Sequence, residues 1–301
     1  MAEDLHQAAR PATVGALRDQ LVSRLEGVVD DPAGEARELL ASLHDAPRSW
    51  ATLHANDLVV DLLIDAAHDA VTRRAAGAPM AYATGRAAFR HLFLHVDERV
   101  LIPRPETEEL VTLALPLITA QSIVVDVGTG SGAIALALAH ESPAARIIGT
   151  DISADAIDVA EMNARALLRR QYARTKFLQG NLLEPIGDAQ VDIVISNPPY
   201  IATRERVDLP AAVRDWEPAL ALFGGDDGMG IIRALVSQAA QRLTAGGYLL
   251  CEIDSRRAGE AIACVTGPLW DETRVVADAF GRDRFVVSRR TAAAASPDGA
   301  V

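Results

Sequence analysis

The tetrapeptide Asn197-Pro198-Pro199-Tyr200 is the stretch of this 301-residue chain whose residue types point most directly to chemistry. It follows the apolar run VDIVIS, so its two prolines predict a rigid, non-helical corner after a buried strand. The Asn197 side-chain oxygen and the Pro198 carbonyl can accept the two N–H bonds of an amino group on an sp² carbon. Such acceptors orient a poorly nucleophilic nitrogen and favour the charge that builds on it. Tyr200 offers a flat face to a planar amide or base.

A glycine-rich turn, Gly128-Thr129-Gly130-Ser131-Gly132, lies upstream between the apolar run SIVVDV and a helix of small residues. Glycine permits a positive φ and lets a ligand lie against bare backbone. The pattern also fits the dinucleotide fingerprint G-x-G-x-x-A. The turn by itself therefore leaves two ligands open, a nicotinamide dinucleotide and S-adenosylmethionine (SAM).

Asp151 ends the next predicted strand, where its carboxylate can accept hydrogen bonds from both ribose hydroxyls of either cofactor. Its alternative role is to cap the following helix, although Ser153 can fill that position instead. SAM is favoured because Asn181 and Leu182 follow a third strand, where an adenine could lie. In addition, no hydride-transfer pair such as Tyr-x-x-x-Lys is evident.

The two motifs together predict an in-line displacement at the methyl group of a sulfonium, with no general base assigned. The predicted catalytic residues are Asn197, Pro198 and Tyr200, and the predicted substrate contacts add Pro199. The predicted cofactor contacts are Gly128, Thr129, Gly130, Ser131, Gly132, Asp151, Leu182 and Asn197.

A sheet must position these residues. Strands are predicted at SIVVDVG, ARIIGTD, TKFLQGN, VDIVISN, GGYLLCEI, TRVVADA and DRFVVSRR. Their alternation with helical patterns indicates a mostly parallel sheet with helices on both faces, and ligands bind such sheets at the carboxyl ends of the strands. The tetrapeptide after the fourth strand and the glycine turn after the first together resemble the amino-group SAM methyltransferases. With this resemblance, the predicted fold class is α/β, a Rossmann-like class I SAM-dependent methyltransferase with a seven-stranded sheet and a small N-terminal helical domain.

Four segments are predicted along the chain. Residues 1–78 carry amphipathic helices, the first of them capped by Thr13, and no good strand pattern. Residues 79–104 form a β-hairpin connector, because aromatic or aliphatic residues alternate with polar ones around Gly85. Residues 105–290 form the methyltransferase domain, which opens on a helix at Pro105. The small and polar residues 291–301 are predicted to be a disordered tail.

Composition limits the partners and the compartment. Acidic residues outnumber basic ones by 41 to 29, a formal charge of −12, which argues against direct binding to nucleic acid. Cys251 and Cys264 belong to no CxxC pair or Cys/His cluster, so two buried free thiols and no metal are expected. No apolar leader is present, and no apolar stretch approaches the ~20 residues of a membrane span. A cytoplasmic monomer without membrane contact is expected.

Several segments, in chain order, resemble those of the peptide-chain release factor glutamine methyltransferases, the PrmC or HemK family. They are IPRPETE, DVGTGSGAIALALA, NPPYI, DWEPALALFGGDDG and GGYLLCEI, and the resemblance covers residues 79–290. It implies SAM-dependent methylation of the side-chain nitrogen (N5) of the glutamine in the Gly-Gly-Gln loop of class I release factors, which modulates translation termination. It also implies the cofactor and glutamine contacts given above. Phe89 and Arg104 are weaker candidates for lining the cofactor pocket.

Two other acceptors stay open. DNA adenine-N6 methylation would use the same tetrapeptide on a flipped base, but the acidic charge and the lack of a Lys/Arg-rich recognition region weigh against it. A glutamine of a ribosomal protein is the substrate of a sister family, and the RPETE segment favours release factors over it. A binding module without activity is disfavoured because both halves of a methyl-transfer site are present.

The chain departs from the family pattern at three positions. Asp254 stands where glycine is common, Arg257 stands where a glutamine is common, and Asn181 stands where an acidic residue is more usual. These departures bear on the fine geometry of the cofactor site. Because a three-residue loop can supply little affinity, residues 1–78 are expected to hold a second surface of the release factor.

Overall fold

The computed structural model describes residues 10–291, and the chain divides into two compact units between Arg86 and Ala87. This division falls inside the predicted connector, 79–104. The predicted tail lies outside the described residues except for Thr291, and so do residues 1–9 of the predicted N-terminal domain.

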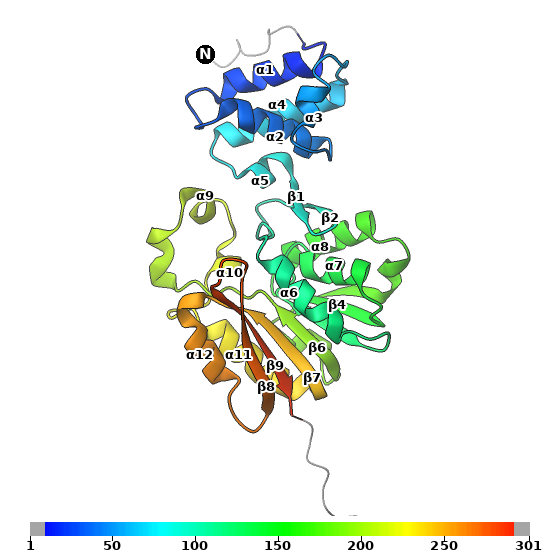
Figure 1. Cartoon of the computed structure of the whole chain (residues 1–301), viewed down its shortest axis with the longest axis vertical. Helices are drawn as coiled ribbons and strands as arrows, with labels where there is room; N and C mark the ends of the chain where they lie inside the picture. The colour runs from blue at the N-terminus through cyan, green and yellow to red at the C-terminus, as the bar shows by residue number, and fades with distance from the viewer. Residues whose placement is uncertain (1–9, 292–301) are drawn as a thin grey trace, which may run out of the picture. The chain divides into compact units, whose positions relative to one another are not determined.

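The first unit is helical and is coloured blue to cyan in Figure 1. Its helices are α1 (Val14–Leu25), α2 (Pro32–Leu43), α3 (Trp50–Leu53), α4 (Asp61–Ala75) and α5 (Met80–Thr84). The predicted cap of α1 is present, because the Thr13 hydroxyl accepts the Ala16 N–H at 3.2 Å. Leu17, Leu21 and Leu25 are fully buried in the core of this unit, so the apolar stripe of α1 faces its neighbours.

The connector differs in part from its prediction. Its first residues form the helix α5, which ends at Gly85 with a left-handed φ of 71°. A two-stranded sheet of β1 (Arg86–Phe89) and β2 (Leu92–His95) follows, which confirms the hairpin.

The second unit holds a seven-stranded sheet with the order β5-β4-β3-β6-β7-β9-β8, and all seven strands were predicted. The pairs from β5 to β7 are parallel, whereas β9 pairs antiparallel with β7 and with β8. The strands are β3 (Ile123–Val127), β4 (Arg146–Asp151), β5 (Thr175–Gln179), β6 (Val191–Ser196), β7 (Leu243–Glu252), β8 (Trp270–Ala277) and β9 (Asp283–Arg290).

Helices pack along this sheet, with α7 and α8 against β3, β4 and β5, and with α11 and α12 against β7, β8 and β9 (Figure 1). The helices of the unit are α6 (Thr107–Ala114), α7 (Ala133–Glu141), α8 (Ala154–Leu167), α9 (Ala211–Arg214), α10 (Ala219–Leu222), α11 (Gly230–Arg242) and α12 (Ala258–Cys264). Short 3-10 turns are η2 (Leu115–Leu117), η3 (Arg170–Arg174), η4 (Glu184–Ile186), η5 (Thr203–Asp208) and η6 (Ser255–Arg257).

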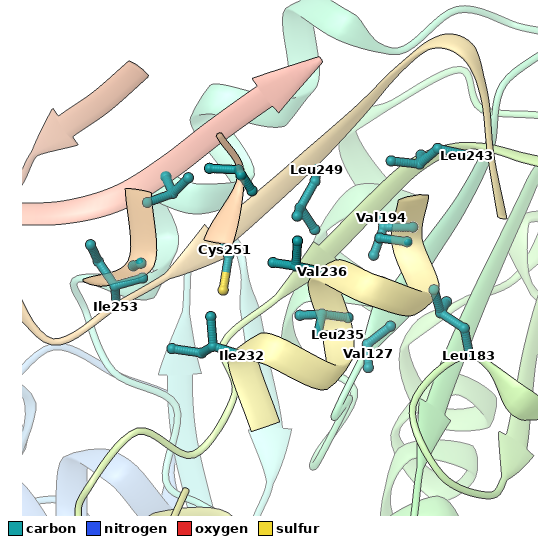
Figure 2. Close-up of a cluster of buried hydrophobic side chains, with 14 of the residues drawn as sticks. Val127, Leu183, Val194, Ile232, Leu235, Val236, Leu243, Leu249, Cys251 and Ile253 are labelled. Carbon is teal, nitrogen blue, oxygen red and sulfur yellow. The ribbon is translucent and has the colours of Figure 1, made fainter. Parts of the chain in front are cut away.

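A buried apolar cluster fixes the centre of the sheet. Figure 2 shows Ile232, Leu235 and Val236 of α11 beside Val194 of β6 and Leu249 of β7. Burial of such side chains stabilises the fold by about 1.5–3 kcal/mol each. The two predicted motifs begin at the carboxyl ends of β3 and β6. Both strands contribute side chains to this packed cluster, so the motifs start from well-ordered backbone.

Cysteine burial matches the prediction only in part. Cys251 is buried, but Cys264 at the end of α12 is partly exposed, because that end of the helix meets solvent. Within residues 10–291, no group of three or more His, Cys, Asp or Glu side chains is arranged to hold a metal ion. No helix in the same range has the length and apolarity needed to cross a membrane.

Candidate active site

The glycine-rich turn joins β3 to α7 at the carboxyl edge of the sheet. Gly128 and Gly130 have φ angles of 72° and 54°, and a Cβ built on either would meet no atom within 4 Å. At Gly132 a Cβ would press on Leu136 and Ala160 at 3.1 and 3.3 Å. The first two glycines therefore leave open space beside bare backbone, whereas the third lets α7 begin close to α8.

Asp126 braces this turn from inside the protein. Its Oδ2 accepts the Thr129 hydroxyl at 2.7 Å and the Ala135 N–H at 3.1 Å, and burial raises its pKa to about 7. Thr129 and Ser131 are buried, and the Ser131 carbonyl accepts a hydrogen bond from Asn163 at 2.9 Å. Thr129 and Ser131, both predicted to contact the cofactor, thus make hydrogen bonds that stabilise the conformation of the turn.

Asp151 lies at the end of β4, beside the turn. It accepts the Gly130 N–H on Oδ2 and the Ser153 N–H on Oδ1, both at 2.9 Å. Ser153 in turn caps α8, because its hydroxyl accepts the Ala156 N–H at 3.2 Å. Burial raises the pKa of Asp151. Each carboxylate oxygen has a second acceptor site, so the group can still receive hydroxyl hydrogens from a ligand.

A cavity of about 220 Å³ opens at this edge of the sheet. Among the residues discussed from sequence, its lining contains Gly128, Gly130, Asp151, Ser153, Asn181, Leu182, Asn197, Pro198 and Pro199. It does not contain Thr129, Ser131 or Gly132. The fully buried Phe89, a weaker candidate, lines neither this cavity nor the smaller one described below.

The residues of this cavity fit SAM. Open space lies beside the backbone of Gly128 and Gly130, so a ligand can approach closely there. The Asp151 carboxylate offers acceptors that suit ribose hydroxyls. Leu182, held at a φ of 50°, supplies apolar surface on which a planar base can lie.

The tetrapeptide begins where β6 ends. The Ser196 hydroxyl donates to the Val127 carbonyl at 2.7 Å, which ties the ends of β6 and β3 together. A second cavity of about 80 Å³ is lined by all four residues from Asn197 to Tyr200. Asn197, Pro198 and Pro199 also line the larger cavity. The structure thus brings Asn197, Pro198 and Pro199 to the boundary between the two cavities, and Tyr200 to the smaller cavity alone.

Glycines from the FGGDDG segment hold the tetrapeptide in place. A Cβ on Gly224 would lie 2.4 Å from the Pro199 carbonyl oxygen, and one on Gly228 would lie 2.4 Å from that of Tyr200. Backbone hydrogen bonds from Ile201 to Leu222 and from Gly224 to Ile201, at 3.0 and 2.9 Å, complete the contact. Side chains at these glycine positions would displace the corner.

Two residues without a predicted role lie behind the tetrapeptide. The Asn197 amide donates to the Thr107 hydroxyl at 2.9 Å, and Thr107 donates to Glu252 at 2.7 Å. The Tyr200 hydroxyl donates to the other oxygen of Glu252 at 3.3 Å. Burial raises the pKa of Tyr200, so its phenol stays protonated and does not act as a base at neutral pH.

Arg104 lines the smaller cavity and not the larger one, although it was a weaker candidate for lining the cofactor pocket. Its guanidinium contacts both carboxylate oxygens of Glu217, at 2.6 and 2.8 Å, and Glu217 is buried. Glu217 belongs to the DWEPALALFGG segment, which also contributes Leu220, Ala221 and Phe223 to the larger cavity. The sequence shows the DWEPALALFGG segment, but no residue spacing in it predicts that it lines a cavity.

The two departures after β7 pair with each other. Arg257 and Asp254 form a buried ion pair, and Arg257 also contacts Glu205 at 2.7 Å. Arg256 adds a contact to Asp254 at 2.6 Å. Because Glu205 accepts the Ala202 N–H at 3.1 Å, this cluster ties the loop after β7 to the segment that follows the tetrapeptide.

Comparison with known proteins identifies the class. Residues 108–213 match the Methyltransferase small domain, and residues 16–85 match the PrmC N-terminal domain. The catalytic domain of hMettl16 in complex with MAT2A 3'UTR hairpin 1 superposes with a TM-score of 0.53 at 15% identity, over 74% of this chain and 80% of that one. A methyltransferase from Pyrococcus furiosus gives 0.50 at 14% identity, over 66% and 88%. The protein has the class I methyltransferase fold, as predicted.

Closer relatives identify the family. The release factor glutamine methyltransferase of Moorella thermoacetica is 40% identical over 269 residues, which are 88% of this chain and 94% of that protein. The protein of the same name from Streptomyces coelicolor is 39% identical over 87% of this chain and 92% of its own. This chain belongs to the release factor glutamine methyltransferase family, which confirms the resemblance of its motifs, and it is an enzyme.

Proposed function

We propose that this enzyme transfers the methyl group of SAM to the side-chain N5 of the glutamine in the Gly-Gly-Gln loop of class I release factors, and so modulates translation termination. The observation that carries the proposal is the position of Asn197, Pro198 and Pro199, which line both cavities. A methyl donor in the larger cavity and a planar amide in the smaller one would meet at these residues. We place this activity in the cytoplasm and expect the enzyme to act as a monomer.

The residues of the corner account for the reaction. Bound SAM supplies an electrophilic methyl group on a sulfonium. The Asn197 Oδ1 and the carbonyl of the buried Pro198 accept the N–H bonds of the glutamine amide and direct its nitrogen toward the larger cavity. They also stabilise the positive charge that develops on this nitrogen. Tyr200 lays its ring along the small cavity, which excludes water from the amide.

No observation favours the other acceptors considered from sequence. A flipped DNA base would require a basic surface for the duplex, and the chain carries a formal charge of −12. The family relation supports a glutamine, and the relatives are named for release factors rather than for ribosomal proteins.

Mass spectrometry of release factors tests the function. After incubation with enzyme and SAM, we expect one added methyl group on the glutamine of the Gly-Gly-Gln loop and none on a factor in which that glutamine is replaced by alanine. Duplex DNA and ribosomal proteins serve as parallel substrates. Methyl transfer to either of these in place of the factor would contradict the proposal.

We also propose that the first unit recognises the body of the release factor. Four of its large apolar side chains are strongly exposed within ten residues, from the end of α3 to the first turn of α4: Leu53 at 77%, Leu58 at 83%, Val60 at 66% and Leu62 at 81%. Exposed apolar groups that gather in one region are typical of protein-binding surfaces. A large protein substrate supplies a partner for them that a short peptide lacks.

Replacing Leu58 and Leu62 with serine should raise the apparent KM for whole release factor about 10-fold, because anchor side chains supply much of the affinity of a protein interface. The KM for a short peptide that contains the Gly-Gly-Gln loop should not change. Phe280→Ser is the matched control, since Phe280 is also apolar and 71% exposed but belongs to the second unit. Equal effects on factor and peptide would refute the role of this stretch.

A further inference from the structure

Asn197 is joined to a buried carboxylate by two successive hydrogen bonds. Its Nδ2 donates to Thr107 Oγ1 at 2.9 Å, and the Thr107 hydroxyl donates to Glu252 Oε2 at 2.7 Å. Thr107 is the first residue of α6, and Glu252 is the last residue of β7. Both are closed to solvent, with 4% and 1% of their surfaces exposed, so water does not compete for these contacts.

The direction of this chain of hydrogen bonds follows from the number of hydrogens. A threonine hydroxyl carries one hydrogen, and here it goes to Glu252, so toward Asn197 the hydroxyl can only accept. The Nδ2 end of the Asn197 amide must therefore face Thr107. If the amide turned by half a rotation, Oδ1 would meet the lone pairs of the hydroxyl, and two N–H donors would face the N–H donors of the substrate.

We infer that Thr107 and Glu252 are positioning residues that fix which end of the Asn197 amide is presented to the substrate amide. The inference rests on the proposed function, because the acceptor Oδ1 is needed only where the substrate nitrogen brings two hydrogens. It adds a role to the RPETE segment, of which Thr107 is part, and to the carboxyl end of β7.

Glu252 also connects the two sides of the tetrapeptide. Its Oε1 accepts the Tyr200 hydroxyl at 3.3 Å, so one carboxylate orients both the amide and the ring. Burial raises the pKa of Glu252, while the hydrogen bonds from Thr107 and Tyr200 and the charge of Arg284 oppose that shift. Substitution of Glu252 would thus disturb both Thr107 and Tyr200, whereas substitution of Thr107 removes its contacts to Asn197 and Glu252 and leaves the contact of Tyr200 to Glu252 in place.

Thr107→Val and Thr107→Ser form a matched pair for the test. Valine keeps the shape of threonine but has no hydroxyl, and serine keeps the hydroxyl. With a glutamine peptide as substrate, the valine variant should lose about 10-fold or more in kcat, because a misplaced reacting group is costly, with little change in the Kd for SAM. The serine variant should retain most of the wild-type kcat. Unchanged kcat in the valine variant, or equal losses in both, would overturn the inference.

A readout without substrate separates this inference from the proposed function. The side-chain amide protons of Asn197, observed by NMR in ¹⁵N-labelled full-length protein and assigned with Asn197→Ala, should exchange slowly in the wild type and in Thr107→Ser. They should exchange faster in Thr107→Val. Protection that is the same in all three proteins would refute the inference. Failure of the wild type to methylate glutamine, with protection as expected, would refute the proposed function alone.

Glu252→Gln supplies a second variant. Glutamine keeps an oxygen that can accept the Thr107 hydroxyl, so the direction of the hydrogen bonds from Asn197 through Thr107 is preserved. Its amide nitrogen then faces Tyr200 and donates to the phenol oxygen, which reverses the hydrogen bond between these two side chains. We expect a smaller loss of kcat than in Thr107→Val. A larger loss would show that the charge of Glu252 matters to the reaction itself and would contradict a role confined to positioning.

Discussion

Replacing Asn197 with alanine should lower kcat for glutamine methylation by ~10²-fold or more, in line with the loss of one preorganised polar contact to a reacting group in other enzymes. The side-chain oxygen that accepts an amide N–H is lost, and with it the orientation of the nitrogen and part of the stabilisation of its charge. SAM binding should stay nearly intact, because Asn197 is one of many residues that line the larger cavity. Single-turnover kinetics and calorimetry with SAM measure the two effects separately.

Asn181→Ala is the matched control for this substitution. Asn181 lines the larger cavity but not the smaller one, and its amide donates to Glu184 at 2.9 Å. Its loss should leave kcat at saturating SAM close to that of the wild type. If Asn197→Ala instead bound SAM poorly and kept its kcat, Asn197 would have to be reassigned to the cofactor site.

Gly130→Val should weaken SAM binding by ~10²-fold or more, since it fills the space in which a ligand would lie and ~3 kcal/mol corresponds to that factor. No atom lies within 4 Å of a Cβ at this position, so the added side chain extends into open space. The Gly130 N–H also donates to Asp151, which places the backbone of the turn beside the predicted ribose contact. Calorimetric titration with SAM, or with S-adenosylhomocysteine, measures the loss.

Gly281→Val is the control that distinguishes two effects of Gly130→Val, the filling of the cavity and the strain of a valine at a positive φ. Gly281 also has a positive φ, 75°, and no atom within 4 Å of a built Cβ, but it lies in the turn between β8 and β9 and outside the cavity. Both valines should destabilise the fold by about 1–2 kcal/mol, because an L side chain is strained in the left-handed region. Only the variant at Gly130 should lose SAM. Equal losses of SAM binding in the two variants would show that strain, not occupancy, is responsible.

The fold could be predicted because its signals are local. Each of the seven strands is a short apolar or alternating run, and the caps at Thr13 and Ser153 depend on neighbouring residues. The glycine turn and the tetrapeptide could be brought together from the rule that ligands bind at the carboxyl ends of parallel strands. These signals suffice for the class of reaction and for the edge of the sheet at which we propose that it occurs.

The supporting contacts of the site could not be predicted in this way. Thr107 and Glu252 are 145 positions apart, and Arg104 and Glu217 are 113 apart, so no local pattern connects them. The glycine turn shows a second limit, because sequence does not tell which of its residues face the ligand. Thr129 was predicted to contact the cofactor, but its hydroxyl is engaged by the buried Asp126.

The buried pair of Asp254 and Arg257 constrains how this enzyme can be redesigned or recombined with its relatives. Replacing only one of the two residues would break this pair and leave the other charge with a single kind of partner, Arg256 for Asp254 or Glu205 for Arg257. Exchanging both together removes the charges as a pair. Arg257 also contacts Glu205, which lies about 50 residues earlier in the chain. A chimaera whose crossover falls between Glu205 and Asp254 would therefore take Glu205 from one parent and the pair of Asp254 and Arg257 from the other. The three residues are best transferred as one block.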